Sequence, residues 1–249
     1  MNFNLPDLKK FLKFIAKKYP VFPLNQWYGQ KGIFLRHDLE LDVKDGYKIH
    51  LLEKKYHLRS TIFVLTTSVT YNPCASKNRR MLAEISKNGF EIGLHFDPTI
   101  YGNIAIAQLQ KRAKAEAHLL STIINKKVTS ISQHRPKVSA NHDRYIVFKN
   151  FHNAYDPRIF SPEKYISDSR MRFLKDIYKF CEKADDQTIQ ILLHPDHFFK
   201  IGKNYPDKLC QYFEEFTEDV DENFKMVSSY YLTIKKEKLF DYVIKKSKK

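Results

Sequence analysis

The chain has 249 residues, of which 43% are hydrophobic and 14% aromatic. This composition excludes a mainly disordered protein and fits one large domain over 1–249, since α/β barrels often run this long undivided. The formal net charge is +15, but the lysines are spread along the chain and accompany no recognised nucleic-acid module, so we expect no specific nucleic-acid partner. A negatively charged glycan or nucleotide sugar is compatible with this charge.

No stretch of the sequence has the features of an export signal or a membrane span. The first twenty residues carry five lysines and have no uncharged core. No later segment is long and uncharged enough to cross a membrane. Cys74, Cys181 and Cys210 lie far apart without a CxxC pair, which indicates reduced thiols. We therefore expect a cytoplasmic protein without a transmembrane segment.

Strand and helix patterns alternate along the first part of the chain. Leucines and an isoleucine at helical spacing predict a helix near the start, over about 5–15. β-branched apolar runs predict buried strands, and apolar residues at helical spacing predict the helices between them. The expected strands are 32–37, 60–65, 90–95 and 128–133, and the expected helices are 42–57, 78–88, 104–124 and 141–150.

The remaining residues repeat the alternation less regularly. Residues 154–155 and 165–167 resemble short strands, and 172–183 has a helical pattern. Residues 188–194 form the last clear strand pattern, which Pro195 ends. An apolar stripe at 209, 212, 213 and 216 predicts a further helix. Strands that alternate with helices predict a parallel sheet, open or closed.

Polar side chains follow four of the predicted strands. If the strands are parallel, their ends meet at one edge of the sheet, where α/β proteins place their sites. Carboxylates two residues apart on an extended backbone project on the same side, so one could hold a metal while the other moves a proton. Mixed histidine and carboxylate ligands suit a divalent cation. The groups are Asp38 with Glu40, His95 with Asp97, His134 with Arg135, and His194.

Six stretches of the chain resemble motifs of one protein family and occur in the order of that family. They are RHDLELD (36–42), STIFVL (60–65), GFEIGLHFDP (89–98), SQHRP (132–136), YISDSR (165–170) and ILLHPDHF (191–198), and they cover about residues 30–200. The family is that of the polysaccharide deacetylases, which are NodB-homology proteins also called carbohydrate esterase family 4. The similarity is closest to the cytoplasmic branch associated with O-antigen and related glycan biosynthesis.

The resemblance implies an α/β fold, a deformed (β/α) barrel of the NodB-homology type, here with extra N- and C-terminal helices. It also implies a role for each matching residue. By this similarity, Asp38 is the catalytic base, Glu40 a metal ligand, His95 the first metal-binding histidine, Arg135 the arginine that orients the base, Asp168 the carboxylate that tunes the acid, and His194 the acid that protonates the leaving group.

The sequence departs from the family pattern at one metal ligand. The usual motif is H-x-x-x-H, but the residue four positions after His95 is Thr99. Asp97 and His134 are both candidates for the missing ligand. The metal that the resemblance implies is a divalent ion, with Zn²⁺ the first choice.

These observations predict a metal-dependent deacetylase that acts on an N-acetyl or O-acetyl group of a sugar in cell-surface polysaccharide synthesis. Its substrate would be an acetylated sugar, a nucleotide sugar or a lipid-linked glycan. Two alternatives stay open: hydrolysis of another non-peptide C–N bond, and a catalytically silent glycan-binding or scaffold protein on the same fold. Trp27, Tyr71, Phe96 and Tyr101 are aromatic residues that could stack on sugar rings.

Overall fold

The computed structural model describes residues 1–135, 145–234 and 237–248. Contacts divide the chain into two compact units, Met1–Phe199 and Lys200–Lys249. All six motif stretches belong to the first unit. The single domain expected over 1–249 stays a prediction. Among the described residues, no helix combines the length and the apolar character that a bilayer crossing requires.

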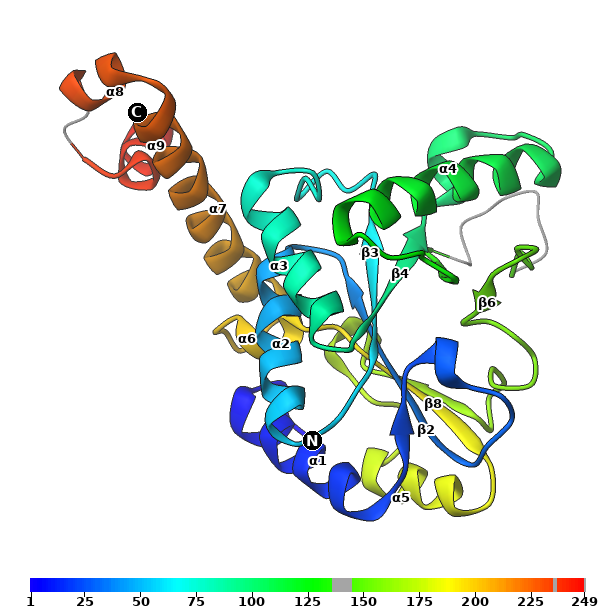
Figure 1. Cartoon of the computed structure of the whole chain (residues 1–249). Coiled ribbons are helices and arrows are strands. Elements are labelled where there is room, and N and C mark those ends of the chain that lie inside the picture. Colours follow the sequence, from blue (N-terminus) through cyan, green and yellow to red (C-terminus); the bar gives the residue numbers. More distant parts are fainter. Residues whose placement is uncertain (136–144, 235–236, 249) are drawn as a thin grey trace. The chain divides into compact units, whose positions relative to one another are not determined.

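The first unit is built on a parallel sheet curved into part of a barrel (Figure 1). The strands follow the order β6-β5-β4-β3-β2-β8-β7, with β1 beside the first half of β2, and every pairing is parallel. The expected α/β fold of the deformed-barrel type is therefore confirmed. The strands are β1 (Val21–Phe22), β2 (Gly32–Leu39), β3 (Thr61–Leu65), β4 (Glu91–Phe96), β5 (Ser130–Gln133), β6 (His152–Asn153), β7 (Tyr165–Ser167) and β8 (Thr188–Leu193).

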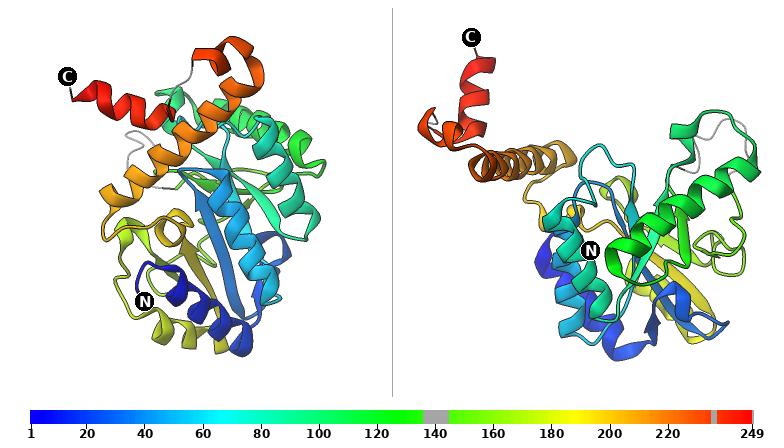
Figure 2. Two further views of the ribbon diagram at one scale, coloured as in Figure 1. Left: turned by 90° about the vertical axis from the view of Figure 1, so that its left-hand side faces the viewer. Right: turned by 45° about the horizontal axis from the view of Figure 1, so that its top comes forward.

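Helices pack on the outer face of this sheet. Figures 1 and 2 show α2 and α3 side by side against it, and α2 begins where the Asp42 side chain accepts a hydrogen bond from the backbone of Asp45. One apolar cluster joins α3 and α4 to β3 and β4, and another joins α1, α2 and α5 to β2 and β8. The α-helices of this unit are α1 (Leu5–Lys18), α2 (Val43–Lys55), α3 (Ser76–Lys87), α4 (Ile106–Ile124), α5 (Ile177–Cys181) and α6 (Asp196–Phe199).

Strand β2 is buried on both faces and divides its side chains between them. Ile33 and Leu35 face the helices, and His37 on the same side bonds Glu53 of α2 at 2.7 Å. The alternate residues Phe34, Arg36 and Asp38 therefore face the inside of the barrel, because successive side chains of a strand point to opposite faces. A buried arginine and a buried aspartate thus share the inner face of the central strand.

Gly93 of β4 makes room for the ring that lies beneath this arginine. A Cβ atom at Gly93 would lie 2.5 Å from the Phe63 ring, which is too close for any side chain. Phe63 in turn lies with its ring centre 5.5 Å from the guanidinium carbon of Arg36. The absence of a side chain on β4 therefore helps to place Arg36 inside the barrel.

Several predicted boundaries differ from the structure. The strand expected at 154–155 is instead β6, at His152–Asn153, and the strand over 128–133 begins at Ser130. The helix expected over 172–183 begins only at Ile177, because Asp176 caps its first turn. Of the helix expected over 141–150, residues 141–144 lie outside the described residues, and 145–150 form a loop and a turn.

The second unit consists of helices. The stripe that includes Tyr212 lies on α7 (Tyr205–Val227), as expected, and α8 (Ser229–Ile234) and α9 (Leu239–Ser247) follow. Asn204 caps α7 by accepting a hydrogen bond from the backbone of Asp207. Lys200 binds Glu215 of this helix at 2.9 Å.

Candidate active site

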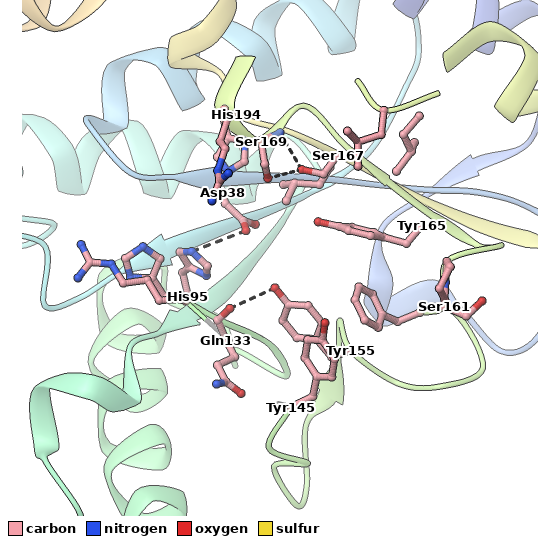
Figure 3. Close-up of a pocket in the computed structure, with 18 of the residues that line it drawn as sticks. Asp38, His95, Gln133, Tyr145, Tyr155, Ser161, Tyr165, Ser167, Ser169 and His194 are labelled. Carbon is pink, nitrogen blue, oxygen red and sulfur yellow. Dashed lines mark hydrogen bonds and ion pairs between the residues drawn. The ribbon is translucent and has the colours of Figure 1, made fainter. Parts of the chain in front are cut away.

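The carboxyl ends of β2, β4, β5, β7 and β8 surround one cavity. Its volume is about 1230 Å³, and its lining includes Asp38, Glu40, His95, His134 and His194. Figure 3 shows Asp38, His95 and His194 close together on one side of this cavity. The parallel sheet explains why residues separated by more than 150 positions meet here, since every one of these strands ends at the same edge.

Three histidines of the site are held in the same way. His95 Nδ1 lies 3.2 Å from the backbone oxygen of Ser132, which can only accept, so this nitrogen carries the proton. His134 Nδ1 lies 3.1 Å from Asp97, and His194 Nδ1 lies 2.6 Å from Asp168. Each ring is thus held in place by a hydrogen bond at Nδ1, and its Nε2 atom is the one directed into the cavity.

The Nε2 atoms point toward two carboxylates. His95 Nε2 lies 3.6 Å from Asp38 Oδ2, while His134 Nε2 and His194 Nε2 each lie 3.6 Å from Glu40 Oε1. Glu40, His95 and His134 offer ligand atoms that lie within 4.8 Å of one another. Within the described part of the chain, His95 Nε2 is buried without a hydrogen-bond partner.

This donor set fits a divalent metal ion. Burial lowers the pKa of His95 to about 4, although nearby Asp38 opposes the shift, so the ring is neutral at pH 7 and its Nε2 has a free lone pair. Metal-binding histidines usually donate their other nitrogen to a carbonyl or a carboxylate, as His95 and His134 do. Two histidines and one carboxylate are also the ligands of many catalytic zinc sites, which keep a position open for water or substrate.

Asp97 lies behind His134. Its Oδ2 accepts a hydrogen bond from His134 Nδ1, and its Oδ1 accepts hydrogen bonds from the backbone and the hydroxyl of Thr99. These contacts and that of His134 lower the pKa of Asp97 to about 2, against the opposing effect of burial. Of the two candidates for the third ligand, His134 therefore has the ligand geometry, and Asp97 orients it.

Asp38 receives its guanidinium partner from its own strand. Arg36 Nη2 donates to Asp38 Oδ2 at 2.8 Å, and Nη1 donates to Gln190 of β8 at 2.8 Å. Burial raises the pKa of Asp38, but the charge and hydrogen bond of Arg36 together with the nearby His95 and His194 outweigh burial, and the net shift is downward. Arg135, expected in this place, is exposed at the edge of the cavity. Among the described residues, the guanidinium that bonds Asp38 is that of Arg36.

Asp168 is buried and binds two histidines. Its Oδ1 contacts His194 Nδ1, while Oδ2 lies 3.0 Å from His197 Nδ1 and accepts the backbone N–H of His194. Burial alone would lower the pKa of His194, yet the charges and hydrogen bonds of Asp168 and Glu40 together raise it well above 6.5. His194 is therefore a charged proton donor at pH 7. Asp168, His194 and His197 form a second group with metal-binding geometry, but both histidines already bond Asp168 through Nδ1.

The wall opposite the carboxylates is aromatic. Tyr145 stacks on Tyr155 at 4.7 Å between ring centres, and Phe160 follows at 4.8 Å from Tyr155 and from Tyr165. Figure 3 shows Tyr145, Tyr155 and Tyr165 across the cavity from Asp38. The sequence pattern missed these rings, since β6, β7 and the loop between them have little regular alternation.

The aromatic residues proposed from the sequence for sugar stacking do not line this cavity within the described chain. Tyr71 is buried, and its hydroxyl bonds the backbone of Leu39 and Leu65. Phe96 packs in the core between Tyr101 and Phe148. Trp27 packs against the apolar cluster that contains Phe34 and Phe63. Its indole N–H donates a hydrogen bond to the Thr188 hydroxyl, near the edge of the sheet opposite the cavity. Tyr71, Phe96 and Trp27 therefore contact other parts of the folded chain rather than this cavity.

No protein-family model and no curated protein matches the chain. Solved structures show a weak likeness. A mutant of a CE4 family pseudoenzyme from Bacillus anthracis is 13% identical, with a TM-score of 0.46 over 76% of this chain and 63% of that one. The Xyl-CE4 domain of a xylanase from the hindgut metagenome of Trinervitermes trinervoides is 15% identical, with a TM-score of 0.44 over 78% of this chain and 84% of that one. A polysaccharide deacetylase from Bacillus cereus is 14% identical, with a TM-score of 0.41 over 67% of this chain and 80% of that one.

Proposed function

We propose that the protein is a metal-dependent hydrolase that removes an acetyl group from the nitrogen of a sugar. The observation that carries this proposal is the convergence of Glu40, His95 and His134 beside two further acid–base groups, Asp38 and His194. A divalent ion held by Glu40, His95 and His134 would lower the pKa of water and polarise the acetyl carbonyl. Zn²⁺ is the ion we propose for these ligands.

The protein's own side chains supply the proton transfers. Asp38, kept ionised by Arg36, accepts a proton from the attacking water. His194, kept charged by Asp168, donates a proton to the leaving sugar nitrogen. The two groups approach the cluster from different strands, β2 and β8. Acid and base are thus separate residues, and their shifted pKa values leave Asp38 ionised and His194 protonated at pH 7, as the two roles require.

The substrate that we propose is an acetylated sugar carried on a nucleotide or a lipid during cell-surface polysaccharide synthesis. The motif stretches that resemble the O-antigen branch support this choice, and the aromatic wall offers faces on which a sugar ring can stack. We place the reaction in the cytoplasm because Cys74, Cys181 and Cys210 are free thiols.

Acetate release from N-acetylated sugars tests the proposal. The protein is stripped with a chelator and assayed with and without added Zn²⁺, beside Asp38→Asn. Asp186→Asn is the matched control, because this exposed aspartate precedes β8 at the opposite edge of the sheet. We expect release that requires metal, is lost in Asp38→Asn and persists in the control.

Other outcomes would point to the alternatives. Release from O-acetyl sugars alone would change the bond that is cleaved, and hydrolysis of a different amide would indicate another non-peptide C–N bond. Glycan binding by a metal-free protein without any release would identify a catalytically silent binding protein. Release that survives Asp38→Asn would remove Asp38 from the role of base.

A further inference from the structure

We propose that three arginines, Arg135, Arg170 and Arg172, form a binding site for an anionic group of the substrate, either a phosphate or a carboxylate. The inference rests on the proposed function, because the anion would belong to the sugar that carries the acetyl group. It assigns a charge to that sugar, which the site for acetyl hydrolysis does not require.

The charges that line the cavity are unevenly distributed. Its carboxylates within the described chain are Asp38 and Glu40, and both are engaged by Arg36 and the histidines. Arg135, Arg170 and Arg172 also line the cavity and are exposed to solvent. In the part of the chain that the structure describes, none of these three guanidinium groups has an ion-pair partner. Their charge is therefore available to a ligand.

The arginines lie on two sides of the reacting groups. Arg135 directly follows His134, and Arg170 comes two residues after Asp168. Since consecutive Cα atoms are about 3.8 Å apart, Arg170 starts within about 8 Å of the aspartate that holds His194. His134 and His194 both approach Glu40 Oε1 at 3.6 Å. Arg135 and Arg170 thus reach the cavity from the β5 and β7 sides of the metal-binding group.

The backbone at both positions has an uncommon conformation. The φ angle is +48° at Arg135 and +60° at Arg170, a region that residues other than glycine adopt at some energetic cost. The loop after β7 is also fixed by local bonds: Ser169 donates its backbone N–H to the Ser167 hydroxyl at 3.0 Å, and Arg172 donates to the Asp168 carbonyl at 3.3 Å. Such conformations cluster at ligand sites.

The chemistry of the three groups specifies the ligand. A guanidinium presents planar, paired N–H donors that match the oxygens of a phosphate or a carboxylate, and it keeps its charge at every physiological pH. The aromatic wall lies across the cavity from Asp38, where Figure 3 shows Tyr155 and Tyr165. A sugar ring stacked on this wall would place its acetyl group toward the carboxylates and its anionic substituent toward the arginines.

Calorimetric binding to the zinc-loaded full chain tests the inference. Asp38→Asn is used as the background so that turnover does not interfere, and N-acetylglucosamine 1-phosphate is compared with neutral N-acetylglucosamine. We expect the phosphorylated sugar to bind at least about tenfold more tightly, with an advantage that shrinks as salt rises. Arg170→Gln with Arg172→Gln should remove most of the advantage, leaving only what Arg135 supplies, and should leave the affinity for the neutral sugar unchanged.

A matched variant controls for net charge. Arg79→Gln with Arg80→Gln removes two exposed arginines from α3, outside the cavity lining, and should keep the full advantage. An N-acetylated amino sugar with a carboxylate in place of the phosphate identifies the anion: the one that binds more tightly is the group that the arginines select. Equal affinity for neutral and anionic sugars, or an advantage that is undiminished by the loss of Arg170 and Arg172, overturns the inference.

The inference and the proposed function fail separately. Acetate release from a neutral sugar, without any preference for an anion, would leave the hydrolase standing and remove the anion site. Tight, arginine-dependent binding of the phosphorylated sugar without acetate release would keep the site and remove the hydrolase.

Discussion

Arg36 and Asp38, two residues apart on β2, form a buried ion pair in which Nη2 lies 2.8 Å from Oδ2. Breaking such a pair leaves a buried charge without its partner and typically costs about 3–5 kcal/mol. We expect Arg36→Gln to lower the free energy of unfolding by about this amount, measured by urea denaturation. Arg36→Lys keeps the charge but cannot bond Asp38 and Gln190 through one planar group. It should therefore lower the free energy of unfolding by less than Arg36→Gln does.

The same variants should change the pH dependence of catalysis. Without the Arg36 charge the pKa of Asp38 rises, so the acidic limb of kcat/KM for acetate release should move to higher pH in Arg36→Gln and move less in Arg36→Lys, which keeps the charge. Arg135→Gln is the comparison that separates the two arginines, and its acidic limb should match the wild type. If Arg135→Gln moves this limb and Arg36→Gln does not, the base is oriented by Arg135.

The place of Arg36 could have been read from the sequence. Residues two apart on a strand share a face, so a strand that delivers Asp38 to the inside of the barrel also delivers Arg36. The resemblance directed attention to Arg135 instead, at the matching motif position. A motif fixes the residue type but not the strand from which a side chain reaches the base, and here the neighbouring side chain on β2 is nearer.

The main strands were predictable because their β-branched runs are buried on both faces. The short elements were not. β6 has only two residues, and parallel backbone pairing with β5 places it, which leaves no hydrophobic period to detect. The late start of α5 could have been found, since Asp176 is a good capping residue in the middle of the expected helix. The aromatic wall depends on long-range folding of an irregular segment, and no local pattern marks it.

Asp97 and His134 should affect metal affinity to different extents, because the structure gives one the place of a ligand and the other a place behind it. We expect Asp97→Asn to weaken Zn²⁺ binding by about 10- to 100-fold, because it loses the carboxylate that orients His134. His134→Ala and His95→Ala remove ligands and should bring the bound zinc, measured by mass spectrometry after dialysis, to near zero.

Variants elsewhere define the specificity of this result. His118→Ala, an exposed histidine on α4, and His197→Ala, in the second histidine group, should both retain one zinc per chain. Loss of zinc in His197→Ala with retention in His95→Ala would move the ion to the group around Asp168. Complete loss in Asp97→Asn with retention in His134→Ala would make Asp97 the third ligand.

Asp168 sets the protonation of His194, and its removal should be visible at alkaline pH. The rate falls as pH rises through the pKa of His194, because the deprotonated ring has no proton to donate. Asp168→Asn removes the charge that raises this pKa, so the alkaline limb of the acetate-release profile should move to lower pH. His197→Gln keeps the contact between Asp168 Oδ1 and His194, so the alkaline limb of its pH profile should move less than that of Asp168→Asn. If the alkaline limb lies at the same pH in the wild type and in Asp168→Asn, His194 is excluded as the acid.

Glu91, at the start of β4, provides a pH dependence of stability that is independent of the cavity. Its carboxyl is buried and accepts hydrogen bonds from Thr61, Ser130 and the backbone of Asn25, yet burial prevails and raises its pKa above the ordinary 4.5. Between 4.5 and the higher folded value, the folded protein binds more protons than the unfolded chain, so stability falls as pH rises. Below 4.5 both states are protonated and the full stabilisation is present.

Glu91→Gln isolates this dependence because the amide does not titrate. The variant keeps one acceptor oxygen and loses the other, so at pH 4.5 we expect it to be less stable than the wild type by about 1–3 kcal/mol. As pH rises to 7, the wild type loses stability through Glu91 and the variant does not, so the gap in unfolding free energy should narrow. Urea denaturation of both proteins across this range measures the gap. A gap that stays constant or widens with pH would show that the folded protein stabilises the charged form of Glu91.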